Sequence, residues 1–383
     1  MPFFEPEHEE YRDIVRDFVS RDIVPRYDQW EADGCVDPAI WESAAQLGLL
    51  GLEVGPEYGG MGLHDWRFRL VVIEELGFAG VAALSTGFAA HDDLVLPALM
   101  TLGTPEQCQR WLPGMATGEL IGAIALTEPG TGSDLRAIRT TAVADGDDWV
   151  LNGQKAFVSN GRLAGVMIVA AATGGSSGKS ELTLFVVERD APGVERGQPL
   201  HKLGLHSQDT VEVFFTDCRV HADNVLGTVG TGMAALQGLL PRERLAQAAV
   251  SWAGAMGALR LTEEHVFSRR AFGQRVADFQ NTRFTLADVE TGLDVTRAYL
   301  EQCVERLNDD TLTAVEAAKA KWWSSEQGVS ATTRLLQLFG GYGFMEEYPI
   351  ARAFRDSRVQ TIYGGTTEIM KEIIGRDIAA RHR

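Results

Sequence analysis

The sequence predicts an α+β fold in which a central block of β-strands lies between two helical regions. Apolar residues recur at helical spacing in the first third of the chain and again after about residue 230. Between these regions, short β-rich runs alternate with polar turns, which indicates a mostly antiparallel β unit. We therefore expect an N-terminal helical domain over 1–117, a central β domain over 118–229 and a C-terminal helical domain over 230–383.

The bulk composition limits the classes of partner. The chain has 383 residues, 45% of them hydrophobic, so it is long enough to bury the cores of two or three domains. A formal net charge of −18 argues against a nucleic-acid backbone or an anionic membrane as the main partner. No uncharged apolar run reaches the roughly 18 residues of a membrane span, and the acidic N-terminus resembles neither a signal nor a transit peptide. We expect a cytoplasmic protein.

The cysteines argue against a metal site or a disulfide framework. The four of them, Cys35, Cys108, Cys218 and Cys303, lie far apart and form no C-x-x-C pair near histidines. A reducing compartment fits this usage best.

The expected elements follow the apolar pattern in order. An amphipathic stripe near the N-terminus comprises Tyr11, Ile14, Val15, Phe18 and Val19. Strands are expected in IGAIAL, TTAVADGDDWVLNGQKAFVS, VMIVAAAT, LTLFVVER and VEVFFTDCRV, and the GGSSGKS segment at 174–180 is expected to connect two of them. Long helices are expected over 244–270, 278–307 and 311–337, and Pro241 is well placed as the first residue of the first of these helices.

Two segments of the β unit could contact a planar polar ligand. In ALTEPGTGSDLRA (125–137), Thr127, Gly132 and Ser133 offer hydroxyl and backbone N–H groups without bulk. On its own, this composition is more typical of a Pro-Gly β-turn. In NGQKAFVSNG (152–161), Phe157 and Ser159 share one face of a strand and could flank an aromatic ring, although an isolated phenylalanine is more often a core residue.

Two helix beginnings carry candidate chemistry. Glu243 and Arg244 follow Pro241, where an acid is more often a complement to the helix dipole and an arginine a solvated or ion-paired side chain. In IYGGTTEIMKE, the Gly364–Gly365 turn has no side chains and precedes a helix whose first residues include Thr366 and Glu368. Such a turn presents unpaired N–H groups to a ligand but contains no acid or base. The segments SRRAFG and QLFGGYGF say little individually.

Five segments, taken together in their order and spacing, resemble the acyl-CoA dehydrogenase family of flavoproteins. They are ALTEPGTGSD, NGQKAFVSNG, RRAFGQ, QLFGGYGF and IYGGTTEI, and the resemblance covers essentially the whole chain. The resemblance implies an N-terminal all-helical domain, a central β-barrel-like domain and a C-terminal four-helix bundle. It also implies a homotetramer, built as a dimer of dimers, that binds FAD between the β domain and the C-terminal helices.

The resemblance assigns cofactor contacts by position. The flavin is expected to contact Leu126, Thr127, Gly132, Ser133, Phe157, Ser159, Thr366 and Glu368. The adenosine and pyrophosphate part is expected to contact Arg269, Phe272, Gln337 and Gly341, largely across the dimer interface. Phe157 and Ser159 stand where most members have Trp and Thr, and the change to Phe would alter access to the ring.

The resemblance also locates the missing base. Many members carry the catalytic glutamate directly after the Tyr of the turn, where this chain has Gly364. Long-chain and isovaleryl-CoA dehydrogenases carry it on a helix just before an Arg, and that position here is Glu243. The resemblance therefore favours Glu243 as the catalytic base over the interpretation that it only complements the helix dipole. The sequences of the segments KLGLHSQDT and IYGGTTEIMKE are more similar to those of the long-chain type than to those of the isovaleryl type. The substrate is expected to contact Ser133, Arg244, Tyr363, Ser85, Thr86 and Ala89.

The implied reaction converts an acyl-CoA thioester to the trans-2-enoyl-CoA. Glu243 would remove the α-proton, flavin N5 would accept the β-hydride, and the Gly364 N–H with a ribityl hydroxyl would stabilise the enolate oxygen. Electron-transferring flavoprotein would reoxidise the flavin. Two alternatives stay open: a flavin oxidase or monooxygenase of the same fold that acts on a non-CoA substrate, and a non-catalytic assembly subunit.

Overall fold

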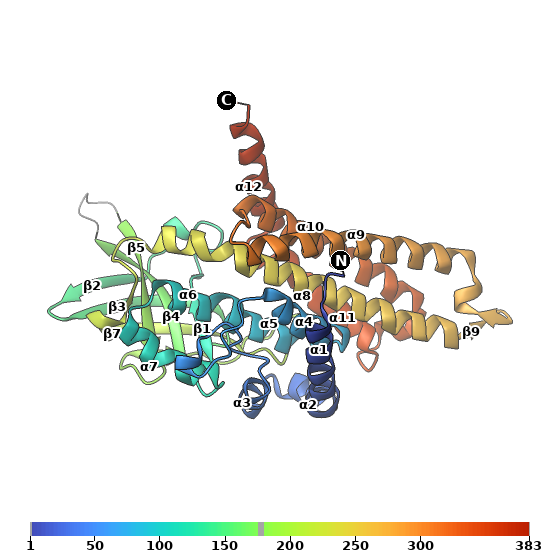
Figure 1. Cartoon of the computed structure of the whole chain (residues 1–383), viewed down its shortest axis with the longest axis horizontal. Helices are drawn as coiled ribbons and strands as arrows, with labels where there is room; N and C mark the ends of the chain where they lie inside the picture. Colours follow the sequence, from blue (N-terminus) through green and yellow to red (C-terminus); the bar gives the residue numbers. More distant parts are fainter. Residues whose placement is uncertain (1, 175–179, 383) are drawn as a thin grey trace.

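The computed structural model describes residues 2–174 and 180–382 and shows two helical regions on either side of a β-sheet (Figure 1). The N-terminal helices are α1 (Pro6–Phe18), α2 (Val24–Asp33), α3 (Ala39–Gln46), α4 (Trp66–Phe78), α5 (Ala82–Ala90), α6 (Leu96–Leu102) and α7 (Pro105–Ala116), with π-helical turns η1 (Val19–Ile23) and η3 (His91–Val95). Val15 and Phe18 of α1 are buried in one cluster with Trp41 of α3 and Val72 of α4. Ile14, expected on the same stripe, is instead exposed because it lies on the outer edge of α1.

The strands form a single mostly antiparallel sheet, as the sequence predicts. They are β1 (Gly122–Ala125), β2 (Thr141–Asp145), β3 (Asp148–Ser159), β4 (Val166–Gly174), β5 (Ser180–Glu188), β6 (Val194–Arg196), β7 (Thr210–His221) and β8 (Val225–Leu226). Their order is β6-β7-β3-β2-β4-β5-β8, and only the pairs β1–β4 and β2–β4 are parallel among the described strands. Residues 175–179 of the expected connection lie outside the described residues.

Both faces of β4 are buried, which explains its uninterrupted apolar run. Ile168 and Ala170 pack in a cluster with residues of α6 and α7. Met167 and Val169, which alternate with them, pack in a second cluster with Phe185 of β5 and its neighbours. A strand with two buried faces does not alternate between apolar and polar residues.

The C-terminal region contains the longest helices. These are α8 (Gly232–Ser268), α9 (Gln280–Asn308), α10 (Ala314–Leu338), α11 (Pro349–Ser357) and α12 (Thr367–Ala380), with a short hairpin of β9 (Arg270–Ala271) and β10 (Gln274–Arg275) after α8. Helix α8 runs from the sheet to the far end of the molecule, and α12 projects from the body to the C-terminus (Figure 1).

The expectation that a helix begins at Pro241 is wrong. Helix α8 begins at Gly232 and passes through Pro241 without ending. The turn before the proline carries Leu236 and Leu239, which are buried against the cluster under the sheet. Burial of these leucines holds the preceding turn in helical conformation, although an interior proline costs about 3 kcal/mol. Glu243 therefore lies in the fourth turn of α8 and does not complement the helix dipole.

Threonine caps define where several helices begin. Thr104 accepts a hydrogen bond from the N–H of Gln107 at 3.3 Å before α7, and Thr313 accepts one from Glu316 at 3.2 Å before α10. Thr366 caps α12 in the same way, as the sequence predicts. Each hydroxyl satisfies one N–H that the helix itself cannot pair.

Helices α4 and α8 cross at closely packed glycines. A Cβ atom on Gly77 would lie 2.4 Å from the Cβ of Ala253, and one on Gly257 would lie 2.4 Å from the carbonyl oxygen of Gly77. Only residues without side chains allow this approach, which fixes α8 against the N-terminal helices.

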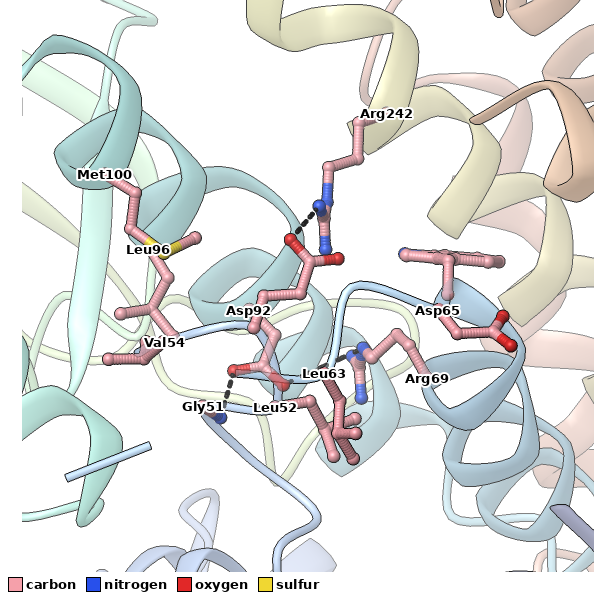
Figure 2. Close-up of a pocket in the computed structure, with 12 residues that line it drawn as sticks. Gly51, Leu52, Val54, Leu63, Asp65, Arg69, Asp92, Leu96, Met100 and Arg242 are labelled. Carbon is pink, nitrogen blue, oxygen red and sulfur yellow. Dashed lines mark hydrogen bonds and ion pairs between the residues drawn. The ribbon is translucent and has the colours of Figure 1, made fainter. Parts of the chain in front are cut away.

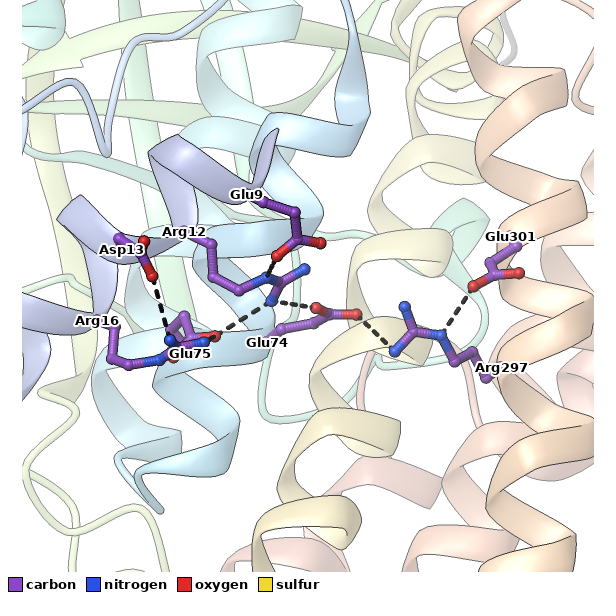
Figure 3. A network of polar contacts seen from close by, with 8 residues as sticks. All are labelled: Glu9, Arg12, Asp13, Arg16, Glu74, Glu75, Arg297 and Glu301. Carbon is purple, nitrogen blue, oxygen red and sulfur yellow. Dashed lines mark hydrogen bonds and ion pairs between the residues drawn. The ribbon is translucent and has the colours of Figure 1, made fainter. Parts of the chain in front are cut away.

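Charged side chains join α1, α4 and α9 (Figure 3). Arg12 of α1 lies 2.5 Å from Glu74 and 3.1 Å from Glu75, both on α4. Arg297 of α9 contacts Glu74 at 3.2 Å and its own neighbour Glu301 at 2.8 Å. Glu74 thus joins the two outer helices, and loss of one partner of such a buried pair costs about 3–5 kcal/mol.

In the part of the chain that the structure describes, no helix is both long and apolar enough to span a bilayer. The same residues contain no group of three or more His, Cys, Asp or Glu side chains arranged to hold a metal ion.

Candidate active site

A cavity of about 190 Å³ lies where the sheet, α5, α8 and the turn before α12 meet. Its walls comprise Thr86, Ala89, Ala90, Leu94, Ile124, Leu126, Thr127, Ala156, Phe157, Ser159, Gln208, Leu240, Glu243, Ala246, Gln247, Val250, Tyr363 and Gly364. The walls are mostly apolar, with a few polar groups, as is usual for a small-molecule site.

Glu243 is the acid of this cavity. Its side chain is buried, and its Oε1 accepts a hydrogen bond from the Nε2 of Gln247, one turn along α8. Its Oε2 is buried and has no hydrogen-bond partner among the described residues. Burial raises the pKa of Glu243 to about 7; the charges of Arg244 and Lys321 oppose the rise and Asp93 adds to it. A carboxyl group with a pKa near neutrality and a free oxygen is suited to act as a general base.

Gly364, the first residue of the Gly364–Gly365 turn, lines the same cavity as Glu243. Gly364 has φ +60° and Gly365 has φ +99°, values that favour glycine. A Cβ atom on Gly364 would lie 2.0 Å from the Oε1 of Gln247, so a side chain at this position and Gln247 exclude one another. Among the described residues, the N–H of Gly364 donates no hydrogen bond. The turn therefore supplies a free donor while Glu243 supplies the acid.

Phe157 and Ser159 line the cavity together with Leu126 and Thr127. Phe157 is not a core residue: it is 68% exposed and adopts φ +57°. This left-handed conformation lies at a register shift between β3 and β7, and it turns the ring out of the sheet. Gly132 and Ser133 are exposed in the neighbouring loop and do not reach the cavity walls.

A buried ion pair positions this wall. Lys155 of β3 lies 2.8 Å from Glu128 and also donates a hydrogen bond to the carbonyl oxygen of Leu126 at 3.1 Å. Glu128 in turn accepts hydrogen bonds from the N–H and hydroxyl groups of Thr140. Burial acts to raise the pKa of Glu128, but these hydrogen bonds keep it below its usual value. The pair fastens the segment of Leu126 and Thr127 to β3.

The residues expected to contact the substrate separate into two groups. Thr86, Ala89 and Tyr363 line the cavity. Ser85 and Arg244 are buried beside it without lining it. Burial lowers the pKa of Arg244, and its Nε has no hydrogen-bond partner among the described residues.

The residues expected to contact adenosine lie elsewhere. Arg269 and Gly341 share a separate open hollow with His265 and Tyr342. Gln337 is exposed outside the residues that line this hollow, and the nearby Phe272 is 97% exposed. Thr366 and Glu368 lie at the start of α12, next to the cavity turn but outside its lining.

Arg242, the residue before Glu243, does not line this cavity. Its side chain reaches into a neighbouring cluster of charges (Figure 2). Arg242 lies 2.6 Å from Glu53 and 3.5 Å from Asp93, and Asp93 also binds Arg69 at 2.9 Å. The space between these groups is about 10 Å³, the size of one water molecule. Through Asp93, this cluster raises the pKa of Glu243 further.

Sequence reasoning missed four polar residues of the site: Gln247, Gln208, Lys155 and Lys321. Each is a single polar residue in a helix, strand or loop of ordinary composition, so neither spacing nor motif marks it. Only Lys155 had a signal, because a lysine on a strand face otherwise occupied by apolar residues indicates a buried partner.

The chain matches family models along almost its full length. The acyl-CoA dehydrogenase N-terminal, middle and C-terminal domain models match residues 5–119, 123–218 and 230–379. A mitochondrial long-chain specific acyl-CoA dehydrogenase of Sus scrofa is 42% identical over 377 residues, which are 98% of this chain and 87% of that protein.

Solved structures share the fold. An acyl-CoA dehydrogenase of Geobacillus kaustophilus is 41% identical with a TM-score of 0.94, covering 98% of each chain. A glutaryl-CoA dehydrogenase of Mycobacterium smegmatis in complex with FADH2 is 25% identical with a TM-score of 0.92, covering 99% of this chain and 96% of that one.

Proposed function

Because this chain belongs to the acyl-CoA dehydrogenase family, an FAD-dependent family of oxidoreductases, we propose that it oxidises an acyl-CoA thioester to the trans-2-enoyl-CoA with Glu243 as the base. The observation that carries the proposal is the arrangement of the cavity. The free Oε2 of Glu243 and the free N–H of Gly364 belong to residues that line the same small apolar space.

The residues present fit a flavin. Leu126, Thr127, Phe157 and Ser159 form one wall of the cavity. Gln208, on another part of the lining, has a buried Nε2 without a hydrogen-bond partner among the described residues, and a flavin ring offers acceptor atoms for such a donor. FAD, when bound, supplies the acceptor for the hydride from the β-carbon.

The remaining steps are those of the protein's own residues. The N–H of Gly364 donates to the thioester carbonyl oxygen, where negative charge develops as the α-proton leaves. Glu243 accepts that proton on Oε2 while Gln247 holds Oε1 in place. The apolar walls exclude water, which strengthens both interactions.

The acyl chain is proposed to extend along α5. Thr86, Ala89 and Ala90 present small side chains there, which leaves depth for a medium-to-long or branched chain. The name of the Sus scrofa relative, a long-chain specific enzyme, is consistent with this direction.

We also propose electron-transferring flavoprotein as the electron acceptor, and a homotetramer built from dimers as the assembly. Arg269, which lines the open hollow, follows Glu243 by 26 residues along α8. At about 1.5 Å per residue, the two residues are about 39 Å apart along the helix. That distance exceeds the length of an extended FAD molecule. This separation supports the proposal that a second copy of the chain supplies the adenosine contacts of each site.

The test uses anaerobic spectroscopy of FAD-loaded protein mixed with acyl-CoAs from butyryl to stearoyl and with isovaleryl-CoA. We expect the wild type to bleach the oxidised flavin with one chain class. Glu243→Gln should bind the same thioester but bleach at least about a hundredfold more slowly, because the general base is lost. Glu264→Gln, an exposed position on the same helix, is the matched control.

Other outcomes identify the alternatives. Equal bleaching by Glu243→Gln would place the base elsewhere. Hydrogen peroxide formed in air with a non-CoA substrate would indicate an oxidase, and protein that cannot be loaded with FAD would indicate an assembly subunit.

A further inference from the structure

A lysine is buried between α10 and the Gly364–Gly365 turn. Lys321 lies in the first half of α10 and is 1% exposed. Its Nζ donates a hydrogen bond to the carbonyl oxygen of Gly365 at 2.7 Å. Within residues 2–174 and 180–382, no carboxylate oxygen lies within 4.0 Å of this ammonium group. A buried ammonium group without a paired carboxylate lowers stability, so we looked for a role in the adjoining site.

The glycine turn requires support from outside. Gly364 and Gly365 both have positive φ, and glycine is the residue that loses most conformational entropy when it is fixed. The Thr366 cap holds the turn on its C-terminal side, and a hydrogen bond from the Tyr363 hydroxyl to Gln360 holds it on the other side. Lys321 contacts the glycine pair itself.

Lys321 also contributes positive charge close to the base. The groups that influence it are Glu243 and Arg244 on α8 and Glu326 on α10. Glu326 is hydrogen-bonded to Thr367 at the start of α12, at 2.6 Å. Burial lowers the pKa of Lys321 to about 8, although the negative charges of Glu243 and Glu326 oppose this change. At neutral pH the residue is therefore a buried cation.

We propose that Lys321 is a positioning residue for the reaction: it clamps the Gly365 carbonyl, which fixes the Gly364 N–H toward the thioester, and its charge keeps Glu243 ionised. The inference rests on the proposed function. It assigns the glycine turn an orienting partner that lies outside the cavity lining.

A defined pH profile follows. Glu243 must be ionised to accept a proton, so the rate of flavin reduction rises through pH 7. Above pH 8 Lys321 becomes neutral and donates a weaker hydrogen bond to the Gly365 carbonyl oxygen, so the turn is held less firmly and the rate falls again on the alkaline side. The other groups that act on Glu243 are Arg244 and Asp93, and the half-buried Tyr363 also interacts with it and has a pKa raised to well above this range. Tyr363 therefore does not account for the alkaline fall.

The experiment compares FAD-loaded wild type, Lys321→Met, Lys321→Arg and the control Lys319→Met on the same helix. The rate of anaerobic flavin reduction is measured from pH 6 to pH 10 with the best acyl-CoA. A second readout uses 3-thiadecanoyl-CoA, in which sulfur replaces the β-carbon. This thioester can lose its α-proton but has no β-hydride, so the long-wavelength absorbance of its anion beside oxidised flavin reports proton abstraction alone.

We expect Lys321→Met to lose the alkaline fall and to raise the pKa of the acid limb by about one unit. Its rate at pH 7 should fall about fivefold, because Glu243 is about half ionised there in the wild type. Its thia-acyl complex should form the anion only at correspondingly higher pH. Lys321→Arg should keep the acid limb and lose the alkaline fall, because arginine stays charged. Lys319→Met should match the wild type.

The inference is overturned if Lys321→Met keeps both limbs, or if the wild type shows no fall between pH 8 and pH 9. The wild-type pH profile needs no variant. It therefore tests the inference even if Lys321→Met fails to fold or to bind FAD. Failure of the proposed function has a different signature, because no acyl-CoA would then bleach the wild type at any pH.

Discussion

At Gly364, the missing side chain is what makes room for Gln247 beside the base. The amide of Gln247 occupies the space that a Cβ at position 364 would enter, and it holds Oε1 of Glu243. The location of the acid on α8 and the glycine in the turn are thus two parts of one arrangement. A sequence shows each residue separately, so their mutual exclusion is visible only in the structure.

We expect Gly364→Ala to destabilise the protein by about 1–2 kcal/mol, because alanine is strained at φ +60°. It should slow flavin reduction by about a hundredfold, since the new Cβ displaces Gln247 and with it Glu243. Gly364→Ala combined with Gln247→Ala removes the clash but keeps the strain, so it should recover rate more than stability. Thermal unfolding and stopped-flow reduction measure the two effects. A wild-type rate in Gly364→Ala would refute the steric argument.

Helix α8 serves the site because successive residues point in different directions. Arg242 extends into the charged cluster of Figure 2, Glu243 into the cavity and Arg244 into the buried space beside it. Residues are separated by about 100° around a helix, so three consecutive charges need not face one another. The packing of Gly257 against α4 fixes the rotation of the whole helix and with it these directions.

Strand β3 supports the cavity wall that we propose to contact the flavin, because Lys155 holds the segment of Leu126 and Thr127. We expect Lys155→Met to lower the free energy of unfolding by about 3–5 kcal/mol, because Glu128 is left buried without its cation. The released loop of Leu126 and Thr127 should also weaken retention of FAD. Gln154→Met changes the neighbouring residue, which points to the opposite face of the strand, and is the control. Denaturant unfolding and FAD dissociation measure both effects; an unchanged FAD off-rate would mean that the loop is held by other contacts.

The elements predicted from sequence are those whose pattern is periodic. The five expected β runs correspond to β1–β5 and β7, and the long C-terminal helices were placed within a few residues of α9 and α10. The start of α8 was misplaced because a proline was given more weight than the buried leucines before it. The short strands β6 and β8 and the hairpin of β9 and β10 were missed, since two or three residues carry no period. Lys321 was missed because a lone lysine in a helix is normally a surface residue.

On the scale of the whole molecule, the two parts expected to contact FAD lie at distant points of one chain. Glu243 shares its cavity with residues of β1 and β3. Arg269 directly follows α8, whose last turn lies beside the β9–β10 hairpin at the end of the molecule away from the sheet (Figure 1). Phe272 in that hairpin is almost fully exposed, an unusual position for a large apolar side chain. Both features are explained if a second copy of the chain brings its hairpin to the site, as the proposed assembly requires.

Co-expression of two inactive variants tests this arrangement. One chain carries Glu243→Gln and keeps its hairpin; the other keeps Glu243 and carries Arg269→Glu with Phe272→Ala. If contacts cross between subunits, each mixed dimer contains one site with an intact base and an intact hairpin. Half of randomly formed dimers are mixed, so about a quarter of the wild-type flavin-reducing activity should return.

Each variant expressed alone, and a mixture of the two purified proteins that cannot exchange subunits, should stay inactive. If all FAD contacts of a site came from a single chain, mixed dimers would hold no intact site, because each chain would carry its own defect. Absence of recovery in dimers shown to be mixed by differential tagging would therefore exclude the shared site and place Arg269 and Phe272 outside FAD binding.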